Sequence, residues 1–309
     1  MKKFFTLFIV TLIVIPGFAQ DAAPADTLPK LWKIQGAVGL NFNQVGLYRW
    51  QGGGVNSMSY TFLYRGTFDY SKDNIYWNNF IDLAYGQLVQ TGNDQKTDDR
   101  WEVGTQLGRK VSSHWDLNAF ANLRSQFQEG FDPDDLTFRI SDLMAPGYLQ
   151  YGLAANYSPT DWLQLNLSPI TSKITFVNDD SLANLRADPE NLEETKGRYG
   201  QDLGQNTRVE YGAYAKISIK KEIIENVLLD TKAEFFTNYA ENFGSIDVFW
   251  DLALLLKVNK WLSASITTNL IYDEDIIMPL ETDKNGNALR SGPSVQFKQT
   301  VGVGISLTY

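Results

Sequence analysis

The chain has 309 residues, of which 43% are hydrophobic and 20% charged, with 24 Gly, 10 Pro and no Cys. After residues 4–15, no run is apolar and long enough to cross a bilayer as a helix, which excludes a polytopic helical membrane protein. The balance of 27 Lys and Arg against 36 Asp and Glu argues against nucleic acid as a partner, because phosphate binding needs a basic stripe. With one His and no Cys, the chain cannot build a thiolate or multi-His metal site, and we expect no cofactor.

The N-terminus has the three parts of a secretory signal peptide. A basic start is followed by an apolar stretch, and Gly17 and Ala19 then supply small residues before a cut. An uncleaved anchor helix is the alternative, but the apolar stretch is too short to span a bilayer. We predict a signal peptide over residues 1–19 and a flexible periplasmic leader over residues 20–31.

After the leader, apolar residues alternate with polar or small ones, which is the period of a β-strand. In the last segment, for example, Val301, Val303 and Ile305 alternate with Gly302 and Gly304. Each such segment is long enough to cross a hydrocarbon layer as a tilted strand. The predicted strands cover residues 32–42, 57–70, 75–90, 100–111, 115–129, 148–157, 162–177, 208–220, 226–239, 246–258, 261–272 and 294–309.

The connections between these segments alternate in length. The predicted short turns are 71–74, 112–114, 158–161, 221–225 and 259–260, and the predicted long loops are 43–56, 91–99, 130–147, 178–207 and 273–293, with a shorter one at 240–245. An outer-membrane barrel has this alternation, because its tight turns face the periplasm and its long loops face outside. The fold class predicted is therefore an all-β, up-and-down, antiparallel transmembrane β-barrel of about 12 strands over residues 32–309. A soluble lipocalin-like barrel or sandwich of about eight to ten strands is the alternative.

Aromatic residues stand at one level of this barrel. They follow three of the short turns and close the last strand, as expected of a girdle at the membrane interface: Trp115, Trp162, Trp261 and Tyr309. The final alternating segment, which ends in an aromatic residue, resembles the signal that delivers barrels to the assembly machinery. We therefore expect outer-membrane localisation, with lipid, glycolipid and the barrel-assembly machinery as partners.

The long loops carry most of the net negative charge, and the segment 178–207 is the most acidic. Solvated loops explain such charge, and the alternative is contact through divalent cations with anionic glycolipid. Asp179 and Asp180 are the nearest approach to a Ca²⁺ ligand pair, but they lack the spacing of an EF-hand loop.

The polar strand faces carry charges of both signs and are predicted to point into the lumen, where they can pair across the interior. The candidate lumen-lining residues are Arg65, Asp82, Glu102, Arg124, Glu210, Lys216, Lys232, Glu234, Asp251, Lys257 and Lys298. Large apolar residues share these faces, either to pack the interior or to form a track for an amphiphilic solute: Tyr76, Phe80, Phe120, Tyr214, Phe236, Phe249 and Leu255.

Three local features stand apart from the alternation. Pro169 interrupts a strand at the point where the apolar positions change parity, which predicts a bulge. In the first long loop, Trp50 precedes three glycines, a candidate constriction at the barrel mouth: Trp50, Gly52, Gly53 and Gly54. His114, the only histidine, lies in a predicted periplasmic turn, which is the wrong end for an outer-leaflet hydrolase, so we expect no enzyme activity.

Several pieces together resemble one family. They are Asn41-Phe42-Asn43-Gln44, Trp50 followed by Gly52-Gly53-Gly54-Val55-Asn56-Ser57, and Leu167-Ser168-Pro169-Ile170-Thr171-Ser172-Lys173. These segments resemble an uncharacterised outer-membrane family of the Bacteroidota, the domain of unknown function 3078. The resemblance extends over nearly the whole mature chain. It implies the barrel and the phylum, but no activity and no functional residues.

Two functions from different classes follow from this architecture. The favoured prediction is a narrow passive channel for small solutes, because about twelve strands exceed what a membrane anchor needs. The alternative is a closed barrel with a structural or docking role, which uses its acidic loops to bind an envelope partner of unknown identity. A lipid-modifying enzyme of the outer membrane comes third.

Overall fold

The computed structural model describes residues 31–45, 56–90, 93–132, 137–185, 195–282 and 288–309. The predicted signal peptide, nearly all of the predicted leader, and the Trp50, Gly52, Gly53 and Gly54 segment lie outside these residues. Within the described ranges, no helix has the length and apolar character needed to cross a membrane.

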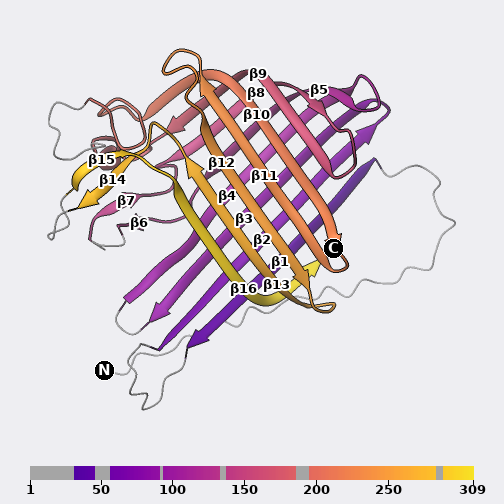
Figure 1. Cartoon of the computed structure of the whole chain (residues 1–309), viewed down its shortest axis with the longest axis horizontal. Coiled ribbons are helices and arrows are strands. Elements are labelled where there is room, and N and C mark those ends of the chain that lie inside the picture. Colours follow the sequence, from indigo (N-terminus) through magenta and orange to yellow (C-terminus); the bar gives the residue numbers. More distant parts are fainter. Residues whose placement is uncertain (1–30, 46–55, 91–92, 133–136, 186–194, 283–287) are drawn as a thin grey trace. The chain divides into compact units, whose positions relative to one another are not determined.

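Twelve strands close into one antiparallel barrel, which confirms the predicted fold class (Figure 1). In chain order they are β1 (Trp32–Val45), β2 (Ser57–Lys72), β3 (Ile75–Gln90), β4 (Asn93–Lys110), β5 (Trp115–Ser125), β8 (Gly147–Tyr157), β9 (Leu163–Phe176), β10 (Thr207–Ile224), β11 (Val227–Asn238), β12 (Asp247–Lys257), β13 (Leu262–Tyr272) and β16 (Gln296–Thr308). Each strand pairs with the next along the chain, and β1 pairs with β16, with Leu40 opposite Ile305. The pairing that closes the sheet extends over Ala37–Asn41 of β1 and Gly304–Thr308 of β16.

The register separates two faces of the wall. Cross-strand partners point to the same side, so Leu40, Phe62 and Tyr85 share one face, while the neighbouring positions face the other way. The first face is apolar and exposed on the outside of the barrel, where Val301 is 66% exposed and Ile170 is 67% exposed. The second face holds the charged residues, which contact one another across the interior. The outside of the barrel is therefore apolar and its inside polar, the reverse of a soluble barrel.

Shorter elements belong to the long connections. They are β6 (Gly130–Phe131), β7 (Arg139–Ser141), α1 (Asp180–Ala183), β14 (Ile277–Thr282) and β15 (Ala288–Pro293). The two hairpins β6–β7 and β14–β15 lie at the end of the barrel opposite the C-terminus (Figure 1). The long connections thus share one end and the short turns the other.

Two local predictions had different outcomes. The bulge at Pro169 is confirmed, because the pairing of β9 shifts register with both of its neighbours there. The predicted long loop over 91–99 is wrong: β4 begins at Asn93, and the β3–β4 hairpin pairs as far as Gln90 opposite Asn93. The charged run from Asp94 to Arg100 is polar enough to look like a loop, but cross-strand pairing with β3 holds it extended.

Two of the long connections, β5–β8 and β9–β10, pack against each other at their end of the barrel. A small apolar cluster joins them: Ala145, Val177, Leu182 and Ala183, with Leu185 and Tyr199 packed against it. Arg139 of the first connection donates to Asp179 of the second at 2.7 Å. We call residues 126–146 and 177–206 together the loop cap; of these, residues 133–136 and 186–194 lie outside the described ranges.

Candidate functional site: the barrel interior

A layer of ion pairs crosses the middle of the barrel. Arg65 on β2 donates to Asp82 on the neighbouring strand and reaches Asp230 on β11, with both N–O distances 2.9 Å or less. Lys232 on β11 lies 3.1 Å from Glu102 on β4. The central ion-pair layer consists of Arg65, Asp82, Arg100, Glu102, Arg124, Asp230, Lys232, Glu234 and Asp251.

Four of these pairs join strands that are not neighbours in the sheet: Arg65–Asp230, Arg100–Asp251, Arg124–Glu234 and Lys232–Glu102. The residues of the Arg65–Asp230 pair are 165 positions apart in the sequence, and those of the Lys232–Glu102 pair 130. Arg124 lies 3.8 Å from Glu234 and places its guanidinium 4.4 Å from the centre of the Phe249 ring. The long cationic side chains therefore span the lumen and narrow it.

One side of the interior is the more densely packed. On β5, β8, β9 and β10, which we call the packed wall, most inward side chains are buried, including Phe120, Asn166, Ser168, Thr171 and Tyr214. The rings of Phe120 and Tyr214 stack with their centroids 5.4 Å apart. Together with Phe236 of β11 they form a buried cluster in the interior. For these residues, the structure favours interior packing over a track for a solute.

The other side of the interior is not filled. On β1, β2, β12, β13 and β16, which we call the open wall, the inward residues are mostly small or polar, such as Thr267, Thr300 and Ser306, and most are only half-buried. The side chain of Arg65 is 43% exposed although it points into the barrel, and that of Arg100 on β4 is 39% exposed. Water therefore reaches both side chains inside the barrel, so water-accessible space lies beside Arg65 on the open wall and beside Arg100 on β4.

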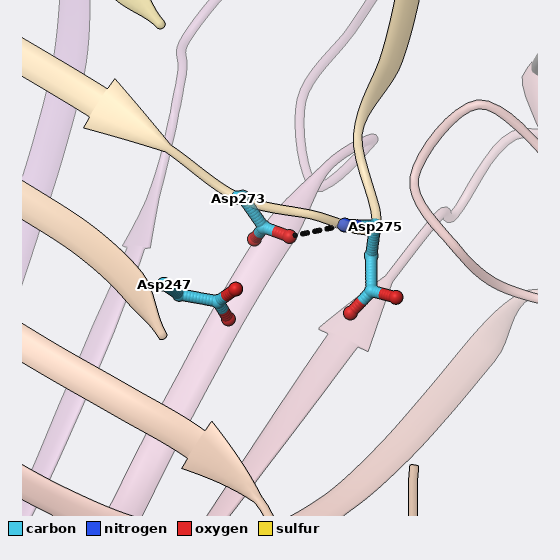
Figure 2. Close-up of side chains that lie close together, drawn as sticks. All are labelled: Asp247, Asp273 and Asp275. Carbon is cyan, nitrogen blue, oxygen red and sulfur yellow. Dashed lines mark hydrogen bonds between the residues drawn. The ribbon is translucent and has the colours of Figure 1, made fainter. Parts of the chain in front are cut away.

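A second charged cluster lies in the interior near the long loops. Lys173 of β9 lies 2.7 Å from Asp247 and 3.0 Å from Asp273, with its side chain only 8% exposed. Asp247, Asp273 and Asp275 bring their carboxylates within 4.8 Å of one another (Figure 2). Arg208 binds Asp275 at 2.7 Å, so Lys173 and Arg208 together hold all three carboxylates. The cluster is therefore a set of ion pairs at the barrel mouth.

Most of the sequence-predicted lumen residues lie in or near these clusters. Arg65, Asp82, Glu102, Arg124, Lys232, Glu234 and Asp251 build the central layer, and Glu210 lies 3.8 Å from Lys173. Lys298 pairs with Asp98 of β4 at 2.9 Å. Lys216 and Lys257 form no ion pair among the described residues, and Lys257 is exposed near a short turn.

Sequence reasoning missed Arg100 and Asp98 as lumen residues. Arg100 lies 3.7 Å from Asp82 and 4.0 Å from Asp251, and Asp98 binds Lys298. Both fall in or beside the segment that was predicted as a loop. The signal that identifies them is the continued alternation of Asp98, Arg100 and Glu102, which keeps all three on one face.

The structure places the four predicted girdle residues near the short turns, and it places Asp179 and Asp180, the candidate Ca²⁺ ligands, in the loop cap. Trp115, Trp261 and Tyr309 are exposed at the short-turn end, and the Trp162 ring lies 4.5 Å from Lys221 Nζ. Asp179 caps α1 by accepting from the Leu182 N–H. Hydrogen bonds from Ser181 above all, and then from Leu182 and Arg139, lower the pKa of Asp179. Asp180 accepts from Asn206, so both carboxylates have protein partners.

Comparison with known proteins gives a family and a set of barrels. The model of a family described as "Protein of unknown function (DUF3078)" matches residues 42–131, which agrees over that range with the resemblance to an uncharacterised family. No curated protein matches the chain.

The solved structures that match include an outer-membrane channel, a porin and the translocator domain of an autotransporter. They include the COG4313 outer membrane channel from Pseudomonas putida F1 (10% identity, 94% of this chain and 100% of that one, TM-score 0.40), the NanC porin (8%, 88% and 98%, 0.36) and the translocator domain of the autotransporter NalP from Neisseria meningitidis (10%, 91% and 90%, 0.32). Because all three TM-scores are low, no argument about function rests on these likenesses.

Proposed function

We propose that this protein is an outer-membrane β-barrel that conducts small solutes through a narrow passage along its open wall. The observation that carries the proposal is the exposure of Arg65 and Arg100. Their side chains lie inside the barrel and are still accessible to water. The central ion-pair layer constricts the passage, so we expect a small conductance. Because that layer carries both signs, we expect little ion selectivity.

The membrane location is supported by the outer face of the barrel. Exposed apolar side chains alternate along its strands, among them Ile34, Leu153, Tyr211, Phe297 and Val301. A contiguous apolar surface of this extent on a water-soluble protein drives association, whereas in a bilayer it contacts lipid tails. Outer-membrane lipid is therefore the proposed surrounding, in a bacterium of the phylum Bacteroidota as the sequence resemblance implies. The strand β16 is the proposed contact for the assembly machinery.

The test is electrical. Purified protein is inserted into planar bilayers in 1 M salt (a high ionic strength that screens surface charge), and current steps are recorded. The proposal predicts small unitary conductance steps. If correctly folded, heat-modifiable protein inserts without any conductance, the passage is closed and the proposal fails.

The second candidate function is a closed barrel that docks a partner through its loops. The loop cap favours it, because an apolar cluster and the Arg139–Asp179 pair give that end a fixed surface. Recovery of a stoichiometric envelope protein after cross-linking in cells, together with absence of conductance, would support docking instead of conduction. We propose no catalytic role for His114, whose ring contacts Ser113 and Tyr157 in an exposed turn.

A further inference from the structure

A polar cavity lies in the interior between the central ion-pair layer and the short turns. Its volume is about 200 Å³, and inward residues of β2, β3, β4, β5, β9 and β10 line it. A water molecule in the liquid occupies about 30 Å³, so the cavity has room for a solute the size of a monosaccharide. Only β2 of these strands belongs to the open wall, whereas β5, β9 and β10 belong to the packed wall.

One cation in the lining of this cavity forms no ion pair among the described residues. Lys216 of β10 lines the cavity, yet it forms neither an ion pair nor a hydrogen bond among the described residues. The other inward cations without an ion pair there, Lys33, Lys110 and Lys257, are exposed near the short turns, whereas Lys216 is half-buried. Glu234 stands directly opposite Lys216 in the β10–β11 pairing, but its carboxylate pairs with Arg124 and Lys232. Lys216 is therefore the half-buried inward lysine whose ammonium forms no ion pair among the described residues.

The rest of the lining is suited to a hydroxylated body. Asn78, Gln106 and Gln164 offer side-chain amides, and each amide both donates and accepts hydrogen bonds. Phe80 adds a ring, which can cover the C–H face of a compact polar molecule. An unpaired ammonium, several amides and an aromatic ring together recognise a carboxylate attached to a hydroxylated body.

We infer that this cavity is a binding site for small hydroxylated carboxylates of the size of a sugar acid, with Lys216 holding the carboxylate. The inference goes beyond the proposed function, since a ligand bound in this cavity does not require a passage along the open wall. Binding in the cavity is measurable without any current, so the two claims can fail separately.

The experiment titrates the full chain in detergent micelles with sodium glucuronate and follows binding by saturation-transfer NMR. Lys216→Met keeps the length of the side chain and removes its charge. A charge-assisted hydrogen bond is lost with it, so we expect glucuronate affinity to fall about tenfold or more. Lys257→Met makes the same charge change outside the cavity lining and is the matched control, with affinity unchanged.

Two further probes test which part of the solute is recognised. Glucose lacks the carboxylate, so it should bind more weakly and be insensitive to Lys216→Met. Acetate lacks the hydroxylated body, so it should also bind more weakly than glucuronate. The inference is overturned if glucuronate shows no saturable binding, if Lys216→Met and Lys257→Met behave alike, or if acetate binds as tightly as glucuronate. Binding without bilayer conductance would refute the channel and leave the binding site standing.

Discussion

The packed and open walls obey the same alternation and yet differ inside the barrel. On β9 the inward residues Ser168, Thr171 and Thr175 are each 2% exposed, whereas on β16 the inward residues Thr300 and Ser306 are only half-buried. Small polar residues line both strands, so their own size does not explain the difference. The packed wall has the rings of its neighbours over it, and the open wall does not. Alternation therefore decides which way a residue points, and its neighbours across the lumen decide whether water reaches it.

The largest expected effect is on stability, at the buried lysine near the packed wall. Lys173→Met would leave Asp247 and Asp273 without their cation, and breaking a buried pair of this kind costs about 3–5 kcal/mol. We expect a clear fall in the urea concentration at which the barrel unfolds in micelles.

The matched change on the open wall is Lys298→Met. Lys298 is 40% exposed and pairs with Asp98, so its loss should cost at most about 1 kcal/mol. Equal destabilisation by the two substitutions would contradict the difference between the walls.

The next effect is on conductance. Arg65→Ala removes a side chain that reaches from β2 to β11 and leaves Asp82 and Asp230 without it, so the passage should widen and become more cation-selective. Reversal potentials in a salt gradient and unitary conductance measure both changes. Lys257→Ala removes the same charge near a short turn, so its unitary conductance and ion selectivity should stay near those of the wild type. A current unchanged by Arg65→Ala would mean that this side chain does not line the conducting path.

The smallest effect concerns the loop cap. Asp179→Ala removes the N-cap side chain of α1 and its contact with Arg139. We expect the free energy of local unfolding of the loop cap to fall by about 1 kcal/mol. Hydrogen exchange of the 177–206 amides measures it. Asp179→Asn keeps an acceptor at the N-cap of α1, so the loop-cap amides should exchange more slowly in this variant than in Asp179→Ala.

The cap should also respond to acid. The pKa of Asp179 is lower in the folded cap than its unfolded value of about 4, so its contribution is present above that pH and is lost as the pH falls through the folded pKa. The protection factors of the loop-cap amides, which correct for the intrinsic pH dependence of exchange, should therefore fall below about pH 4 in the wild type, and this fall should be smaller in Asp179→Asn. If the wild type and Asp179→Asn respond equally to acid, the pH dependence comes from titratable groups other than Asp179.

The sequence predicts the wall better than it predicts the interior. The period of two and the change of parity around Pro169 are local, so they specify the face of each side chain and the bulge in β9. The pairing of Arg65 with Asp230 depends on how the closed sheet curves and staggers, which alternation does not encode. Asp98 was missed for the opposite reason, because the charge density of its segment indicated a loop, although pairing with β3 holds it in a strand.

The most direct test of the two-walled interior uses single cysteines, since the natural chain has none. Thr300→Cys and Thr171→Cys place a thiol on the open and packed walls respectively, both facing inward. The protein, reconstituted in vesicles, is treated with a small charged thiol reagent, and the labelled fraction is measured by mass spectrometry. The account predicts rapid labelling at position 300 and almost none at position 171. Equal labelling, or labelling at 171 alone, would contradict it.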